Sequence, residues 1–217
     1  MNNPMTSKTM DPSEMTPRTG TLTVVSAPRV NGRAVVPRPT VGRLRLRPTR
    51  RGRGFIVGIV DAAGPDTNGF APRDRVAWRD KGEELDELLL LDQDDVLGVP
   101  SWITDEQVVS YLGAGLIARA LVRTRPFARG DDVRVVSTDP LVAEMTAAWA
   151  RSLGARIVPP TAPTATVSIA DDVRIRRTVL GSHGRLAQAA VEVFQAIRAG
   201  VFDGIAVIQG VAPQIAA

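Results

Sequence analysis

The chain has 217 residues, with no cysteine and one histidine, His183. Disulfides, cysteine nucleophiles and metal sites built from cysteine or several histidines are therefore excluded, and we expect no metal. The formal net charge is +4. No apolar run is long enough to span a membrane, and the N-terminus lacks the pattern of a secretory signal, so we expect a cytoplasmic protein.

Six arginines gather between residues 43 and 53 and are the main argument for nucleic-acid binding. No aromatic residue interleaves with them, so they are not suited to stacking on bases. Arg43, Arg45 and Arg47 alternate with Leu44 and Leu46, which predicts a strand with one solvated face. We therefore do not expect nucleic acid as a partner.

The first half of the chain has the composition of a β-rich module. A polar tail over residues 1–19 is expected to be disordered. The run Gly54–Val60 is apolar throughout, which predicts burial on both faces. The acidic segment Asp80–Asp86 is expected to be a solvated loop. Further strands are predicted at Thr21–Val25, Arg33–Val36, Arg43–Arg47, Asp74–Trp78 and Leu88–Leu91.

Helix and strand patterns alternate over residues 104–217, which predicts a parallel α/β sheet. One helix begins at Thr104, which has capping-box spacing with Gln107, and runs to about Val122. The last helix carries an apolar stripe and ends at Gly200. The stripe consists of Leu186, Ala189, Ala190, Val193, Phe194 and Ile197, and strands are predicted at Val133–Val136, Arg156–Val158, Thr164–Ile169, Val173–Leu180 and Ile205–Ile208.

The most informative stretch, Asp132–Val158, has the layout of a strand, a tight turn, a helix and a second strand. Dinucleotide-binding domains begin in this way, with a glycine-rich turn that lets the backbone approach a pyrophosphate. Here the turn Ser137–Pro140 contains no glycine. Asp139 suits the N-cap of a helix that Gly154 ends, with Pro140 at its first position. Because a carboxylate there neutralises the charge that holds a phosphate, we expect no dinucleotide cofactor.

Five collinear stretches between about residues 30 and 210 have the character of one protein family. They are GFIVGIVDAAGPDTNGFAPRDRVAW, with Arg73 in place of a usual glycine, VPSWITDEQVVSYLGAGLIARALV, FARGDDVRVV, AAWARSLGARIV and LAQAAVEVFQAIRAGVFDG. These stretches resemble the zinc-independent quinone and enoyl reductase branch of the medium-chain dehydrogenase/reductase superfamily. The resemblance implies an α/β protein (α+β overall), with a GroES-like β-barrel domain at 20–103 and a Rossmann-like domain at 104–217.

The same resemblance implies that two parts of the family's fold are missing. Between Arg47 and Gly54 the family carries a long substrate-side loop that includes catalytic polar residues. Between Val158 and Val173 it carries the middle of the nucleotide domain, which supplies contacts to adenine and ribose. What remains resembles the β-barrel domain joined to a truncated Rossmann-like domain.

Five residues are candidates for a site in the cleft between the two domains. The resemblance places Tyr111 and His183 near that cleft, where they can donate a hydrogen bond to a carbonyl or act as general acid or base. Trp78 and Trp102 can wall an apolar pocket, and Asn68 is a substrate-binding candidate in a turn. Each of the five also has a structural explanation, as a helix, core or turn residue.

Four functions follow, in order of preference. The first is a reductase-derived enzyme that binds a small apolar or acyl-type molecule and performs cofactor-free cyclisation, isomerisation or elimination in a biosynthetic pathway. The second is a non-catalytic pseudo-enzyme subunit that associates with another protein. The strand predicted at Ile205–Ile208 offers one edge for such pairing, and pairing of two copies of this chain there would give a homodimer. The third is a minimal NADPH-dependent quinone or enoyl reductase. Nucleic-acid binding comes last.

Overall fold

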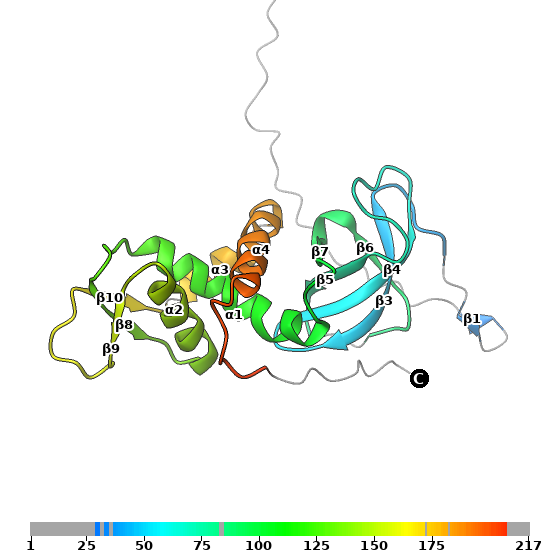
Figure 1. Cartoon of the computed structure of the whole chain (residues 1–217). Coiled ribbons are helices and arrows are strands. Elements are labelled where there is room, and N and C mark those ends of the chain that lie inside the picture. Colours follow the sequence, from blue (N-terminus) through cyan, green and yellow to red (C-terminus); the bar gives the residue numbers. More distant parts are fainter. Residues whose placement is uncertain are drawn as a thin grey trace, which may run out of the picture.

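A computed structural model describes residues 29–30, 33–34, 37–82, 85–171, 173–181 and 183–207. The predicted strand Thr21–Val25 lies outside these residues. A curled antiparallel sheet and a smaller parallel sheet are connected by the long helix α1 (Asp105–Thr124), which runs from one to the other (Figure 1). A short ribbon of β1 (Arg29–Val30) and β2 (Arg33–Ala34) precedes them. This mixed architecture confirms the predicted fold class.

The antiparallel sheet has the order β6-β3-β4-β5-β7. In β3, Leu44 and Leu46 are fully buried while Arg43, Arg45 and Arg47, which alternate with them, are not, as the alternation predicts. In β4, Phe55 and Val57 belong to the core around α1, whereas Ile56 packs into a second core on the opposite face. The strands are β3 (Arg43–Arg51), β4 (Phe55–Ala63), β5 (Arg75–Arg79), β6 (Leu89–Asp92) and β7 (Val96–Gly98), with a short 3₁₀ helix, Gln93–Asp95, before β7.

The parallel sheet has the order β10-β8-β9, as the alternation of helices and strands predicts. The chain passes from β8 (Asp132–Val136) through α2 (Pro140–Ser152) to β9 (Arg156–Val158) on one side. It then crosses to β10 (Val167–Ala170) on the other side of β8. This reversal creates a topological switch point at the carboxyl ends of β8 and β10, where α/β proteins form their ligand crevices.

The remaining helices, α3 (Val173–Gly181) and α4 (His183–Arg198), lie against α1 (Figure 1). The predicted capping box of α1 is present, with Thr104 and Gln107 each bonding the other's backbone amide. A side chain at Gly115 of α1 would come within 2.7 Å of Val193, so this glycine allows α4 to approach closely. One core cluster around α1 includes residues of the antiparallel sheet, α2 and α4.

Two strand predictions are wrong. Residues 173–180 form most of α3, because Ile175 and Val179 are four residues apart and form one partly buried helix face. Alternation with arginines made the same residues look like a strand. The described part of the last predicted strand, residues 205–207, contains no strand. The carbonyl of Ile205 instead accepts a hydrogen bond from the hydroxyl of Tyr111. Ile208 lies outside the described residues.

Four arginines of β3, namely Arg45, Arg47, Arg50 and Arg51, are paired with carboxylates. Arg45 lies 2.7 Å from Asp61, and Arg50 lies 2.6 Å from Glu106. Asp80 is not solvated as predicted, because it is bonded to Arg51 at 2.6 and 2.7 Å and its side chain is 12% exposed. In the described part of the chain, no helix has the length and apolar character needed to cross a membrane.

Candidate functional site

In the turn between β8 and α2, the side chain of Asp139 caps the N-terminus of α2. The Oδ1 atom of Asp139 accepts hydrogen bonds from the amides of Leu141 at 3.1 Å and Val142 at 3.4 Å. The amide of Asp139 donates to Oγ of Ser137 at 3.1 Å. The prediction of Asp139 as N-cap with Pro140 at the first helical position is confirmed. The carboxylate therefore takes the amide donors that a helix N-terminus offers to an anion.

Asp171, directly after β10, extends this arrangement across the switch point. Its Oδ2 atom accepts a hydrogen bond from the Ser137 hydroxyl at 2.8 Å, and Nε of Arg176 lies 3.0 Å from both carboxylate oxygens. Hydrogen bonding from Arg176 lowers the pKa of Asp171, and burial opposes this effect. The same bond raises the pKa of Arg176. Both groups are charged at neutral pH.

Two guanidinium groups flank the capping carboxylate. Nη1 of Arg176 lies 3.9 Å from Oδ2 of Asp139, and Nη1 of Arg53 lies 3.7 Å from Oδ1. Arg176 comes from α3, whereas Arg53 comes from the turn between β3 and β4. Arg53, Asp139 and Arg176 thus connect the antiparallel sheet with the switch point of the parallel sheet.

Two glycines let the β3–β4 turn lie directly on α1. A Cβ atom at Gly52 would come within 2.5 Å of Cβ of Val109, and one at Gly113 would come within 3.2 Å of the carbonyl oxygen of Arg53. Any larger residue at Gly52 would therefore push the turn away from the helix. This close packing fixes where Arg53 stands relative to Asp139.

A small cavity of about 190 Å³ lies where the turn, β5, α1, α2 and α3 meet, and we call it the junction pocket. Its charged lining residues are Arg53, Arg79, Arg176, Asp80 and Asp139. Its apolar lining residues are Phe55, Ala114, Ile117 and Leu141. Binding sites for small molecules are concave and mostly apolar, with a few placed polar groups.

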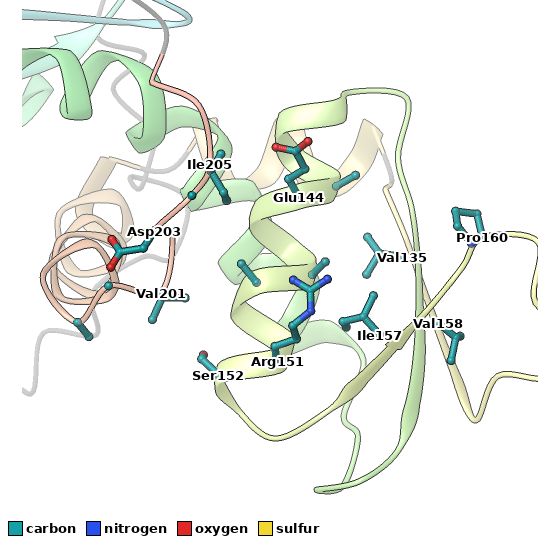
Figure 2. Close-up of a pocket in the computed structure, with 16 residues that line it drawn as sticks. Val135, Glu144, Arg151, Ser152, Ile157, Val158, Pro160, Val201, Asp203 and Ile205 are labelled. Atoms are coloured by element: carbon teal, nitrogen blue, oxygen red, sulfur yellow. The ribbon is translucent and has the colours of Figure 1, made fainter.

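A second, open groove of about 820 Å³ crosses the outer side of α2. Figure 2 shows Glu144 and Arg151 of α2 between Asp203 on the C-terminal segment and Ile157 of β9. The groove is larger than the junction pocket but exposed to solvent. Its lining comes mainly from β8, α2, β9 and the segment 199–205.

The predicted catalytic tyrosine has a structural partner. The hydroxyl of Tyr111 donates a hydrogen bond of 2.6 Å to the carbonyl of Ile205, and the side chain is 4% exposed. Burial, followed by the nearby carboxylate of Asp203, raises the pKa of Tyr111. Tyr111 lines neither cavity. His183 is the first residue of α4, and its side chain lies outside what the structure describes.

The predicted substrate-binding residues lie in three separate places. Trp78 is buried in the core of the antiparallel sheet, with Gly58 leaving room for its ring. Trp102 is 42% exposed and lies under the guanidinium of Arg198, 5.6 Å from it. Asn68 is in an exposed turn and donates its backbone amide to the side chain of Gln93. None of these three lines the junction pocket or the open groove.

Arg53, Asp171 and Arg176 were missed as site residues. Asp171 comes two residues after the predicted strand Thr164–Ile169, and the turn at Ser137 directly follows the predicted strand Val133–Val136. The carboxyl ends of parallel strands that flank a switch point meet at one edge, so this position was the available signal. Among the described residues, no group of three or more His, Cys, Asp or Glu side chains is arranged to hold a metal ion.

Solved structures share this arrangement of elements. A quinone oxidoreductase of Pseudomonas syringae pv. tomato DC3000 matches with a TM-score of 0.58 and 13% identity, over 76% of this chain and 83% of that chain. This chain has the fold of a quinone oxidoreductase. The mycobacterial protein Rv1454c, solved in complex with NADPH, matches with a TM-score of 0.55 and 17% identity, over 77% of this chain and 83% of that one.

The likeness extends to a human protein, the synaptic vesicle membrane protein VAT-1 homolog-like protein. It matches with a TM-score of 0.50 and 17% identity, over 68% of this chain and 59% of that chain. The predicted resemblance to medium-chain dehydrogenases/reductases is thereby confirmed for the fold. A scan against protein-family models and a search of the curated proteins find no match to this sequence.

Proposed function

We propose that this protein uses a reductase scaffold without dinucleotide binding, and that the junction pocket binds a small acyl-type molecule. The observation that carries the proposal is the cap of α2. The carboxylate of Asp139 takes the amides of Leu141 and Val142, which a pyrophosphate would need.

The size of the junction pocket supports a small ligand. Its volume of about 190 Å³ lies below the roughly 300 Å³ at which pockets for drug-sized ligands begin. Phe55, Ile117 and Leu141 provide an apolar wall, and arginines stand at its charged side. A short acyl chain with a polar end matches this division.

The proposed chemistry is cofactor-free and non-redox, such as a cyclisation, isomerisation or elimination in a biosynthetic pathway. This choice of chemistry rests on the proposal that Asp139 prevents a dinucleotide from binding. A pocket of this kind acts by holding its ligand in one reactive conformation, which can supply a large part of a rate enhancement. The arginines near the pocket can stabilise negative charge that develops on a carbonyl oxygen.

A non-catalytic pseudo-enzyme is the second candidate, and the position of Tyr111 favours it. The hydroxyl, for which the sequence predicts a hydrogen bond to a ligand carbonyl, is bonded to the Ile205 carbonyl, and the tyrosine is buried. In this alternative the scaffold binds a ligand or a partner protein and performs no reaction. Turnover of any bound acyl compound would decide against it.

Titration of intrinsic fluorescence with NADPH tests the loss of dinucleotide binding, because the chain contains three tryptophans. We expect no saturable change for the natural protein. Asp139→Gly, which frees the amides of α2, is expected to gain weak binding. Asp66→Gly is the matched control, since Asp66 is in an exposed turn with a positive φ of 57° that glycine adopts easily. Saturable quenching of the natural protein at micromolar NADPH would overturn the proposal.

A further inference from the structure

We infer that the junction pocket recognises the carboxylate of a short-chain acid and that Arg53 is the residue that binds it. The inference rests on the proposed function and narrows its acyl-type ligand to an anion with one negative charge. Three observations carry it: the charge balance of the pocket lining, the position of Arg53 and the apolar residues of the lining.

The charged lining of the pocket has an excess of positive charge. Three arginines face two aspartates there. Both aspartates already have donors, because Asp80 is bonded to Arg51 at 2.6 and 2.7 Å and Asp139 to the amides of α2. Asp171, just behind the pocket, is bonded to Arg176. The lining therefore carries more arginine than aspartate side chains, which favours an anionic ligand over a neutral one.

Arg53 is the arginine of this group that is best placed to take a ligand. Arg176 is committed to Asp171 through two of its nitrogens. Arg53 approaches Asp139 only to 3.7 Å, which is beyond hydrogen-bond distance, and its side chain is 63% exposed. Its planar guanidinium can therefore turn a pair of N–H groups toward a carboxylate, the geometry that this group binds most strongly.

The apolar part of the pocket sets the size of the acid. Phe55, Ile117 and Leu141 are almost fully buried and line the cavity beside Arg53. They leave a volume of about 190 Å³, which holds a chain of a few carbon atoms.

Calorimetric titration with butanoate and its neutral analogue butanamide tests the inference on the full chain. We expect the natural protein to bind butanoate at least about tenfold more tightly than butanamide, since a charge-assisted hydrogen bond is worth that much. Arg53→Gln should bind butanoate about tenfold more weakly, and Arg53→Lys should lie between the two. Arg177→Gln is the matched control, because Arg177 is an exposed residue of α3 outside the pocket lining. This variant should bind butanoate as tightly as the natural protein does.

The place of binding is read from amide chemical shifts in the same titration. Butanoate should move the amide signals of Gly54 and Gly113, which line the junction pocket, and leave that of Gly204 in the open groove unchanged. Equal affinity for butanoate and butanamide, no butanoate binding, or unchanged binding by Arg53→Gln would each overturn the inference. Failure of the proposed function would give a different result. In that case the protein would bind NADPH saturably and would still bind butanoate more tightly than butanamide.

Discussion

At the scale of single residues, the switch point is filled by charges that satisfy one another. Asp139 caps α2, and Asp171 is held by Ser137 and Arg176. A ligand phosphate would have to displace a carboxylate from its amides before it could bind. The consequence is that ionisation of Asp171 contributes to folding stability, and this can be measured.

Replacing Asp171 by Asn should lower stability in a pH-dependent way. Because the pKa of Asp171 is lowered from 3.8, its contribution is present above that value and is lost as the pH falls through the lowered pKa. We expect Asp171→Asn to reduce the free energy of unfolding by about 2 kcal/mol at pH 7. Urea unfolding at several pH values should show this difference shrinking toward pH 2. A difference that stays constant over this range would contradict the assigned ion pair, and Asp66→Asn in an exposed turn is the control.

Tyr111→Phe tests the structural role of the tyrosine. The change removes the hydroxyl that bonds the Ile205 carbonyl at 2.6 Å and keeps the ring in the core. We expect a loss of about 1 kcal/mol in the free energy of unfolding. Amide hydrogen exchange should become faster in residues 199–207 and stay unchanged in β3. Unchanged stability and exchange would mean that this bond does not hold the segment in place.

At the scale of elements, close packing between the β3–β4 turn and α1 positions the site. Gly52→Ala should be destabilising by about 1–3 kcal/mol, because its Cβ would lie 2.9 Å from the carbonyl oxygen of Val109, a backbone atom that cannot move aside. Gly98→Ala is the matched control, since a Cβ at Gly98 in β7 meets nothing within 4 Å. Urea unfolding midpoints compare the two. Equal midpoints would show that the turn does not depend on this contact.

The sequence predicted helix starts well where a single capping side chain bonds to nearby backbone. The capping box of Thr104 and Gln107 and the cap at Asp139 are confirmed because each needs only neighbours in the chain. The α3 prediction failed because alternation and four-residue spacing coincide in Ile175 and Val179. The site itself depends on contacts between distant residues. Ser137 and Asp171 are 34 positions apart, and no local pattern shows that they meet.

At the scale of the whole molecule, one core joins the antiparallel sheet to α1, α2 and α4, and the parallel sheet packs on α1 and α2 in a second core. Phe55 of the antiparallel sheet, Leu112 of α1 and Met145 of α2 belong to one buried cluster. The division of the chain near residue 103 into two domains stays a prediction. A core that crosses this boundary makes it difficult for either part to unfold alone.

We therefore expect the described part of the chain to unfold in one cooperative transition. Variants that keep a single tryptophan report the two halves separately, with Trp78 in β5 and Trp149 in α2. Their fluorescence in urea should give the same midpoint, and circular dichroism should agree with both. Two separate midpoints would show that the sheets are independent units.

The most direct test of the central claim follows backbone amide signals of the natural protein while NADPH and then butanoate are added to one sample. The claim is that the chain's own Asp139 carboxylate takes the place of a cofactor phosphate and leaves the junction pocket to a small acid. We predict that NADPH leaves the signals of Leu141 and Val142 unchanged and that butanoate moves those of Gly54 and Gly113. Saturable shifts of Leu141 and Val142 with NADPH would contradict the account.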